Sequence, residues 1–393
     1  MEIIRKYAQT IVDKTIKILG YNINIMDSQG IIVGSGDKKR INTFHQGAAE
    51  VIRIGRPLEI TFDNARNLEG VKPGVNLPIY LNNKIVGVVG ITGEPDEVRA
   101  FGELLKVSVE TMLQEAFLSE QLRMQQNAKD LYLYDLILGN FEDEDLFEAR
   151  GEALGFDMKL PRIAVVIAVE ELNAGNKIAS ELLLQKKRDY ILSCIKGAFA
   201  DSQNMIGYVG SNSIVVFCVI GKIEIFEIKK QIFGYIERLE NLFQKDRIRF
   251  KVGIGKFYKG LKGLKKSYSE ALQVLALRER MSCQSNVTFA ADVSLEIFLN
   301  SISGEILDNF IANILPHSKI LDILRKPRFF EVLKVFLEND LNISVTAKIL
   351  KVSRNTVVNR LERIKEITGL DVRNFNDAIK LKLLLLICEL KIK

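Results

Sequence analysis

The chain has 393 residues, a formal net charge of +6 and 47% hydrophobic residues. This length is too great for one hydrophobic core, so we expect about two to four domains. The longest apolar runs, such as 163–169 and 214–220, are far below the roughly 18 residues that a membrane span needs. No N-terminal segment has the pattern of a signal peptide, and we therefore expect a cytoplasmic protein without a membrane segment. Because the net charge is mild, any affinity for nucleic acid must come from a local basic patch.

Cysteines and histidines are too scattered to form a metal site. The chain contains Cys194, Cys218, Cys283 and Cys388, and its histidines are His45 and His317. No cysteine lies in a C-x-x-C pair, which argues against zinc ligation and against a disulfide framework. A nucleophile elbow of the G-x-S-x-G kind is also absent. We expect no metal, no cofactor and no catalytic residues.

The N-terminal third has the order of a small PAS/GAF-like α/β sensor. Apolar residues at helical spacing predict a helix over 3–19 that ends at Gly20. Residues 21–34 predict a hairpin with a Gly-ended turn, and residues 77–91 predict a second hairpin that turns at Asn82-Asn83. A helical connection is predicted between the two hairpins. This order is typical of small sensory domains with an antiparallel sheet.

Two polar segments, 34–45 and 62–76, lie between the predicted strands. Loops carried by a rigid sheet are where binding groups concentrate. These segments supply Arg40, Thr43, His45, Arg66, Lys72, Gly74 and Asn76. Cations and amides converging on a cleft would suit a small carboxylate. The alternative is that these are solvated loop cations, and that His45 is a helix cap or a packed side chain.

A long helix is predicted from Asp96 to Leu138. Its apolar residues alternate three and four apart, as in a coiled-coil seam. The residues of this stripe are Val98, Phe101, Leu105, Val109, Met112 and Ala116. We interpret it as a signalling helix that dimerises, with packing on the sheet of its own chain as the alternative.

The middle of the chain, from Leu160 to Arg280, predicts elements in the order βαββαβα. This order resembles a degenerate GGDEF-type nucleotide cyclase domain, on the basis of residues 251–255 and 267–276. The turn 209–213, where that family has glycines and acids, reads Val-Gly-Ser-Asn-Ser. Magnesium-dependent phosphoryl chemistry needs carboxylates there, so catalysis is not expected. A protein that makes or binds a cyclic dinucleotide remains the alternative.

Near the C-terminus, residues 341–365 predict a helix, a tight turn and a second helix. Ser344 and Ser353 are the predicted caps, and Val357, Leu361 and Ile364 form one apolar stripe. The polar faces of the second helix carry Ser353, Arg354, Asn355, Thr356, Asn359, Arg360 and Arg363. Six basic residues against one acid between Lys348 and Lys365 give a net charge of +5. Such a helix pair is typical of one that reads double-stranded DNA in the major groove.

Taken together, the parts resemble the carbohydrate (sugar) diacid regulators, transcription activators with a PucR-type C-terminal helix-turn-helix. In the sensor the resemblance rests on residues 11–15, 20–27, 30–32, 35–37, 40–41, 43–45, 74–78 and 86–93. In the DNA-binding end it rests on residues 342–347, 354–357, 360–364 and 368–371. It covers nearly the whole chain. Ser353, Val358 and Asn359 depart from the residues that relatives often carry, so the operator sequence is not carried over.

The resemblance implies a multi-domain α+β chain: a sugar-diacid sensor over 1–135, a degenerate GGDEF-like domain over 136–305 and an all-α DNA-binding domain over 306–393. It implies glucarate, galactarate or glycerate as the effector, with Arg40, His45, Gly74 and Asn76 at ligand positions. Thr43 and Lys72 are added from their chemistry alone. We expect a homodimer or higher homo-oligomer. A DNA-binding protein that ignores small acids, with an N-terminal domain that only dimerises, is a further alternative.

Overall fold

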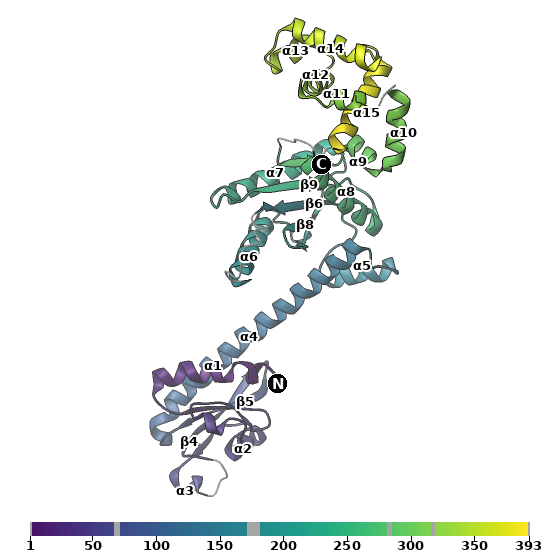
Figure 1. Ribbon diagram of the computed structural model, residues 1–393. Coiled ribbons are helices and arrows are strands. Elements are labelled where there is room, and N and C mark those ends of the chain that lie inside the picture. Colours follow the sequence, from purple (N-terminus) through teal and green to yellow (C-terminus); the bar gives the residue numbers. More distant parts are fainter. Residues whose placement is uncertain (1, 67–70, 171–180, 281–284, 316–318, 392–393) are drawn as a thin grey trace. The chain divides into compact units, whose positions relative to one another are not determined.

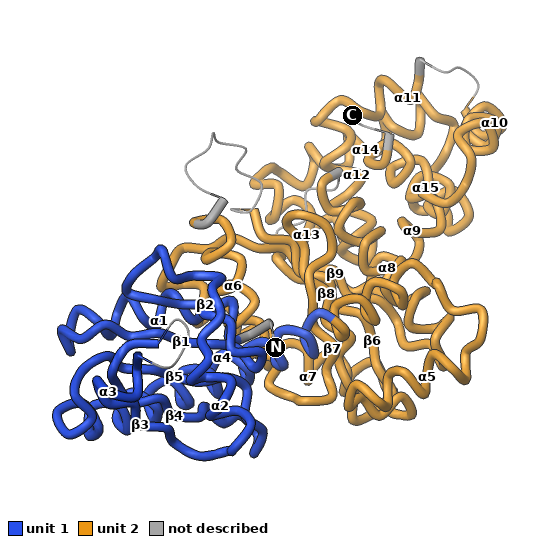
Figure 2. Tube along the Cα trace, turned by 90° about the horizontal axis from the view of Figure 1, so that it is seen from below, with its two compact units in different colours: residues 1–127 blue, residues 128–393 orange. Residues whose placement is uncertain are grey.

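The structure is a computed structural model that describes residues 2–66, 71–170, 181–280, 285–315 and 319–391. The chain divides into two compact units, residues 1–127 and 128–393, which are coloured separately in Figure 2. Each unit has its own sheet and hydrophobic core. The mixed helix-and-sheet class expected from the sequence is confirmed, and the expected domain boundaries at 135 and 305 stay predictions.

The described part of the first unit holds a five-stranded antiparallel sheet in the order β2-β1-β5-β4-β3. Its strands are β1 (Ile23–Asp27), β2 (Ile32–Ser35), β3 (Leu58–Ile60), β4 (Gly74–Leu81) and β5 (Lys84–Thr92). Both predicted hairpins are confirmed. Asn82 and Asn83 both have positive φ, the backbone that a two-residue hairpin turn requires. Strand β3 was not predicted, because three residues are too few to show an alternating pattern.

Helices cover both faces of this sheet. They are α1 (Glu2–Leu19), η1 (Lys38–Arg40), α2 (Gln46–Ile54), α3 (Phe62–Ala65) and α4 (Pro95–Leu138). Helices α1 and α4 pack on one face and α2 packs on the other (Figure 1). Alternation along the strands explains the division: Ile25 belongs to the core under α1 and α4, whereas its neighbour Met26 packs with α2. Helix α1 ends at the left-handed Gly20, as predicted.

Helix α4 is continuous over 44 residues. In the predicted seam, Val98, Leu105 and Val109 are buried in the core that α4 shares with its own sheet. Phe101 and Met112 are exposed. Three residues of the stripe therefore pack on the sheet of their own chain, which is the alternative that the sequence left open, and dimerisation through α4 stays a prediction.

The described part of the second unit contains a five-stranded sheet in the order β10-β9-β6-β8-β7. Its strands are β6 (Arg162–Val169), β7 (Met205–Val209), β8 (Ser213–Val219), β9 (Phe250–Ile254) and β10 (Val287–Phe289). The helices around it are α5 (Glu144–Ala153), α6 (Glu181–Ala198), α7 (Ile225–Gln244) and α8 (Gly260–Arg280). The predicted βαββαβα order is confirmed. Strand β10, which pairs in parallel with β9, was not predicted.

Strand β6 lies at the centre of this sheet and is apolar on both faces because both are covered. Val165 and Ile167 pack with α6 and α7, whereas Ala164 and Val166 pack with α8 and the end of α4. A strand covered on both sides reads as a continuous apolar run, which is why the sequence identified it clearly.

The rest of the second unit is helical. Its elements are α9 (Ser294–Ser301), α10 (Gly304–Ile314), α11 (Lys319–Leu324), α12 (Pro327–Glu338), α13 (Ile343–Ile349), α14 (Arg354–Thr368) and α15 (Phe375–Lys391). They share one core, in which Phe336, Val357 and Leu384 are almost fully buried. Leu277 of α8 joins the same core. The predicted pair of helices near the C-terminus corresponds to α13 and α14.

Candidate effector site and DNA-binding surface

A row of polar residues crosses the first sheet on the face that α2 covers. Strand pairing places Ser35 opposite Asn24, Asn24 opposite Gly90, and Gly90 opposite Asn76. Asn24 and Asn76 are 3% and 4% exposed, in strands that are otherwise apolar. The Asn76 amide oxygen lies only 2.7 Å from where a Cβ of Gly90 would stand, so the glycine makes room for it. The row therefore brings two buried amides to the middle of the sheet.

The two amides differ in their partners. The Ser35 hydroxyl donates to Asn24 Oδ1 at 2.6 Å. The Asn76 side chain makes no hydrogen bond to any residue that the structure describes. A buried amide normally finds a partner, because an unpaired one loses its hydrogen bonds to water without replacement. Asn76 is thus a candidate donor and acceptor for a ligand.

His45 stands at the start of α2 and is buried. Its Nδ1 accepts the backbone N–H of Ala48 at 3.1 Å, so the histidine caps the helix. Burial, with the positive charge of Arg40 as the second cause, lowers the pKa of His45 to about 4. The ring is neutral near pH 7, and because Nδ1 accepts, Nε2 carries the proton. A helix cap was the alternative that the sequence analysis gave to a ligand-binding role for His45. The cap uses Nδ1 and leaves the N–H of Nε2 as a donor on the other side of the ring.

Arg40 ends the short helix η1 and is half-buried. Burial lowers the pKa of its guanidinium, and Asp37, which caps η1, opposes that shift. Thr43 is exposed, and its hydroxyl donates to the Arg40 carbonyl at 2.6 Å. Thr43 therefore fixes the loop that carries Arg40.

Gly74 and Lys72 lie at the start of β4. A Cβ on Gly74 would stand 2.1 Å from the carbonyl oxygen of Ile91, so the pairing of β4 with β5 alone requires glycine here. Lys72 is exposed and precedes the strand. Ligand roles for both stay predictions. The close approach of Ile91 explains why position 74 is a glycine, which the sequence could not show.

The first turn of α2 lies close to this polar row. A Cβ on Gly47 would stand 2.9 Å from Ile60 of β3 and 3.2 Å from the His45 ring. Ile60 pairs with Gly74, two residues from Asn76. Arg40 therefore lies near the His45 ring at the start of α2, and Asn76 lies on the sheet face that α2 covers. The sequence missed Asn24 and Gly90, although an asparagine inside an apolar strand was the available signal.

At the other end of the chain, α13 and α14 are joined by a short turn. The side chain of Asn342 accepts the backbone N–H of Ser344 at 2.9 Å and that of the next residue, and so caps α13. The prediction that Ser344 is the cap is wrong, because Ser344 already lies inside the helix. Ser353 caps α14 as predicted, accepting the N–H of Thr356 at 3.0 Å.

The apolar stripe of α14 is confirmed: Val357, Leu361 and Ile364 are at most 3% exposed. At 3.6 residues per turn, Asn355 and Asn359 lie on the side opposite this stripe. Both are exposed, as are Ser353, Arg354 and Arg363. Thr356 and Arg360 are half-buried beside them. The whole set predicted to meet DNA lies on the faces of α14 away from its core.

Charge divides the outward face of α14 into two halves. In the second half Arg363 pairs with Glu366 at 2.5 Å, and Glu362 pairs with Arg373 at 3.0 Å. In the first half Arg354, Asn355, Asn359 and Arg360 form no hydrogen bond or ion pair with side chains that the structure describes. Unpaired donors at the start of a helix are free to meet base edges and phosphates.

Comparison with known proteins links the two sites. Residues 3–136 match a family model for putative sugar diacid recognition, and residues 329–387 match the PucR C-terminal helix-turn-helix domain. Residues 138–277 match the GGDEF-like domain. The chain is 31% identical over 383 residues to the carbohydrate diacid regulator of Escherichia coli (strain K12). The matched residues cover 96% of this chain and 95% of that protein. The chain belongs to the carbohydrate diacid regulator family.

Two further matches are less similar to this chain. The proline-responsive transcriptional activator PutR of Bacillus subtilis (strain 168) is 26% identical over 249 residues, 62% of this chain and 58% of that protein. A crystal structure of a regulator of polyketide synthase expression from Bifidobacterium adolescentis covers 68% of this chain and 94% of its own, at 20% identity. Its TM-score of 0.33 is too low to support an argument. The family and the helix-turn-helix match identify a DNA-binding transcription regulator.

In the GGDEF-like domain the turn 209–213 is held by the end of β6 and by one cation, Arg188. The backbone N–H of Val169, at the end of β6, donates to Asn212 in the turn, and Arg188 donates to the carbonyl of Ser211 at 2.5 Å. The nearby acid, Glu170, lies 3.3 Å from Arg249 and 3.2 Å from Lys251. Within the described ranges, no three His, Cys, Asp or Glu side chains are grouped to hold a metal.

A cavity of about 580 Å³ lies at the opposite end of the same sheet, between the start of β6 and the start of α8. Lys159, Arg162 and Lys259 line it together with one acid, Glu148, and apolar residues such as Phe257. Arg162 is 1% exposed and donates to the carbonyl of Gln203. The volume suits a small molecule.

No helix in the described part of the chain is long and apolar enough to cross a membrane.

Proposed function

We propose that this regulator is a transcription activator that binds a sugar diacid or glycerate in its first unit and double-stranded DNA through α13 and α14. It acts as a homodimer in the cytoplasm and catalyses no reaction. The effector is glucarate, galactarate or glycerate, and the controlled genes serve its uptake and breakdown. The proposal is carried by Arg40 and His45 at the start of α2 and by Asn76 on the sheet face that α2 covers, in a chain that also carries a basic helix-turn-helix.

The chemistry of these groups favours an acceptor-rich ligand. Arg40 offers a charged fork, His45 offers the N–H of Nε2, and Asn76 offers an amide without a described partner. A hydroxy-dicarboxylate presents carboxylate and hydroxyl oxygens that accept from all three. Thr43, Lys72 and Gly74 keep their proposed places at the rim of the site.

The effector changes DNA binding only by binding one arrangement of the protein better than another. Calorimetric titration of the full chain with glucarate, galactarate and glycerate tests the first step. We expect heat and a rise in the thermal midpoint with at least one of them. If none of the three gives heat or a thermal shift, the proposed diacid effector is wrong, while the proposed DNA-binding role is unaffected.

A second candidate function, the binding of a nucleotide or a cyclic dinucleotide, is favoured by the cavity of about 580 Å³, whose three cations outnumber its one acid, Glu148. Incubation with GTP and magnesium separates it from catalysis, since formation of a dinucleotide product would overturn the claim that no reaction is catalysed. A thermal shift with GTP alone supports binding without turnover.

A third possibility is a regulator that binds DNA regardless of small acids. A footprint on the DNA upstream of its own gene, with and without each diacid, distinguishes it. We expect protection that changes with the effector. Protection that is identical under all conditions favours the constitutive protein. If the protein protects no DNA under any condition, the proposed DNA contact itself is wrong.

A further inference from the structure

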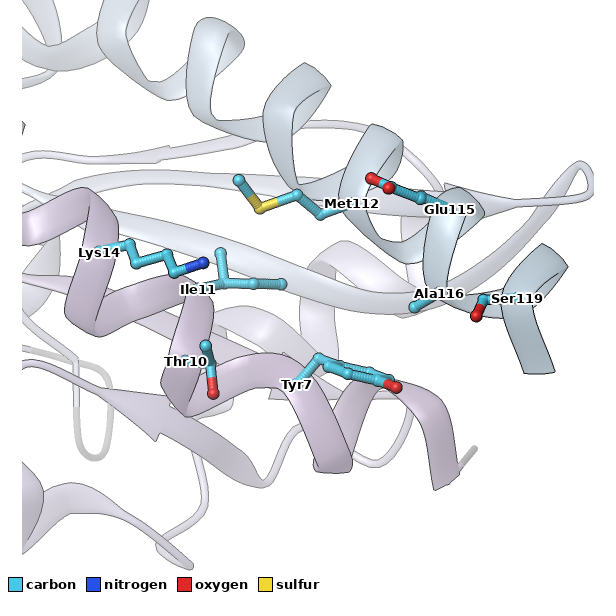
Figure 3. A pocket seen from close by; sticks show the side chains of 8 residues that line it. All are labelled: Tyr7, Thr10, Ile11, Lys14, Met112, Glu115, Ala116 and Ser119. Carbon is cyan, nitrogen blue, oxygen red and sulfur yellow. The ribbon is translucent and has the colours of Figure 1, made fainter. Parts of the chain in front are cut away.

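A groove of about 280 Å³ runs between α1 and α4 on the outer side of the first unit. Tyr7, Ile11 and Lys14 line it from α1, and Met112, Glu115 and Ala116 line it from α4 (Figure 3). The groove lies on the face of the sheet opposite α2, away from the effector residues. It is therefore a separate surface of the sensor.

Helix α4 carries an exposed apolar ridge next to this groove. Leu104 is 66% exposed, Leu118 54% and Leu122 58%, and Met112 in the groove wall is 41% exposed. Because the side of α4 with Leu105 and Val109 is buried against the sheet, helical spacing points the ridge away from it. Leu118 and Leu122 lie one turn apart, whereas Ser108, Thr111 and Glu115 separate Leu104 from them on the same side of the helix. Exposed apolar residues that share one side of a helix mark an interaction surface more often than singly scattered ones do.

The register of the two helices can be derived from one ion pair. Lys6 Nζ of α1 lies 3.8 Å from Glu120 of α4. The groove lining shows that later residues of α1 meet earlier residues of α4, so the helices run antiparallel. Eight residues along each helix in opposite directions bring Lys14 level with Met112. Glu115 stands three residues further along α4, which is about 4.5 Å.

Opposite charges lie on the two walls of the groove. Lys14 and Glu115 are both exposed, and neither forms an ion pair with any residue that the structure describes. In a two-fold dimer whose axis runs parallel to α4, residues keep their level along the helix in both copies. Lys14 of each copy then stands about 4.5 Å along the axis from the level of Glu115 of the other, twice per dimer, as an isologous interface requires.

We propose that the partner of this surface is a second copy of the chain, docked through its own α1–α4 groove and α4 ridge. The reciprocal Lys14–Glu115 pairs set the register, and burial of Leu104, Leu118 and Leu122 supplies the apolar contact. The inference deepens the proposed homodimer by naming its surface, and it rests on that proposal.

Charge reversal in the full-length protein tests the surface. Lys14→Glu gives two Glu–Glu contacts per dimer, and Glu115→Lys gives two Lys–Lys contacts. We expect each single variant to raise the dimer dissociation constant about tenfold or more, measured by analytical ultracentrifugation. A mixture of the two variants restores both opposite-charge pairs, so heterodimers should exceed their statistical share. The double variant should dimerise like the original chain.

Lys84→Glu is the matched control, because this exposed lysine is the first residue of β5, next to the β4–β5 turn, and forms no ion pair with a described residue. Circular dichroism and the thermal midpoint confirm that each variant folds. A wild-type chain that stays monomeric contradicts the homodimer itself. A dimeric wild type with unaffected single variants, or without excess heterodimer, overturns this surface while the homodimer stands.

Discussion

The proposed effector face of the first sheet and the outward face of α14, proposed to meet DNA, would recognise their partners by opposite means. The first uses buried, uncharged donors, two asparagines and a neutral histidine, with one half-buried arginine beside them. The second uses exposed side chains at the start of one helix, with cations free of described partners. A buried site can discriminate between small molecules because every unpaired group there is costly. An exposed basic helix gains affinity from phosphates and reads sequence by a few base contacts.

The two regions should therefore fail independently. Leu361→Ala removes a side chain that is 3% exposed beneath α14, and we expect a loss of about 3 kcal/mol in the free energy of unfolding of the second unit. DNA binding should be lost, while effector binding in the first unit persists by calorimetry. Val358→Ala, at a half-buried position on the same helix, is the control and should cost well under half as much. Loss of effector binding in Leu361→Ala would contradict this independence.

Acid should weaken the first region before the second. His45 has a folded pKa of about 4 against an ordinary value of 6.5, so the unfolded chain binds more protons between these values. Its stabilising contribution is complete above pH 6.5 and is lost as the pH falls to about 4, a difference of about 3 kcal/mol.

His45→Gln keeps a side-chain acceptor for the N–H of Ala48 and removes the titration. Calorimetric unfolding at pH 7 and pH 4.5 should show a smaller acid shift in this variant than in the original chain. The NMR titration of the His45 ring gives its pKa directly. An ordinary value near 6.5 would show that the ring is not buried as described.

The same contrast explains how far the sequence could lead. The helix pair, its cap at Ser353 and its stripe at Val357, Leu361 and Ile364 follow from spacing within one short segment, and all were predicted. The polar row depends on strand register, since Asn24, Gly90 and Asn76 are neighbours only after β1, β5 and β4 pair. Loop residues such as Arg40 could be identified as candidates from their chemistry. Their distance in space from a strand residue does not follow from the order of residues along the chain.

On the DNA side, base readers and phosphate contacts should separate by their salt dependence. Asn355→Ala should cost about 1 to 3 kcal/mol on specific DNA with little effect on random DNA. Lys348→Ala, at an exposed position of α13, should weaken binding to all sequences and lower the salt slope by about one. Fluorescence titrations at several salt concentrations measure both. Equal losses on specific and random DNA for Asn355→Ala would remove its role in reading bases.

On the effector side, the charge of the amide row can be changed without changing its shape. Asn76→Asp introduces a carboxylate next to the proposed dianion, and we expect at least a tenfold loss of diacid affinity, about 1.4 kcal/mol. Asn83→Asp makes the same change in the exposed β4–β5 turn, where affinity should stay the same. Calorimetric titration compares the two variants. Equal affinities would place the effector away from Asn76.

The smallest effect is expected at the border between the two halves of α14. Arg363 is paired with Glu366 at the surface, and exposed pairs at this spacing contribute only about 0.5 kcal/mol to stability. Glu366→Gln should therefore leave the thermal midpoint nearly unchanged while freeing Arg363 for a phosphate. We expect a modest rise in affinity for every DNA sequence and a steeper salt dependence, because one more counterion is released on binding. If affinity and salt slope stay constant, Arg363 lies outside the contact, and the DNA-facing part of α14 ends with Arg360.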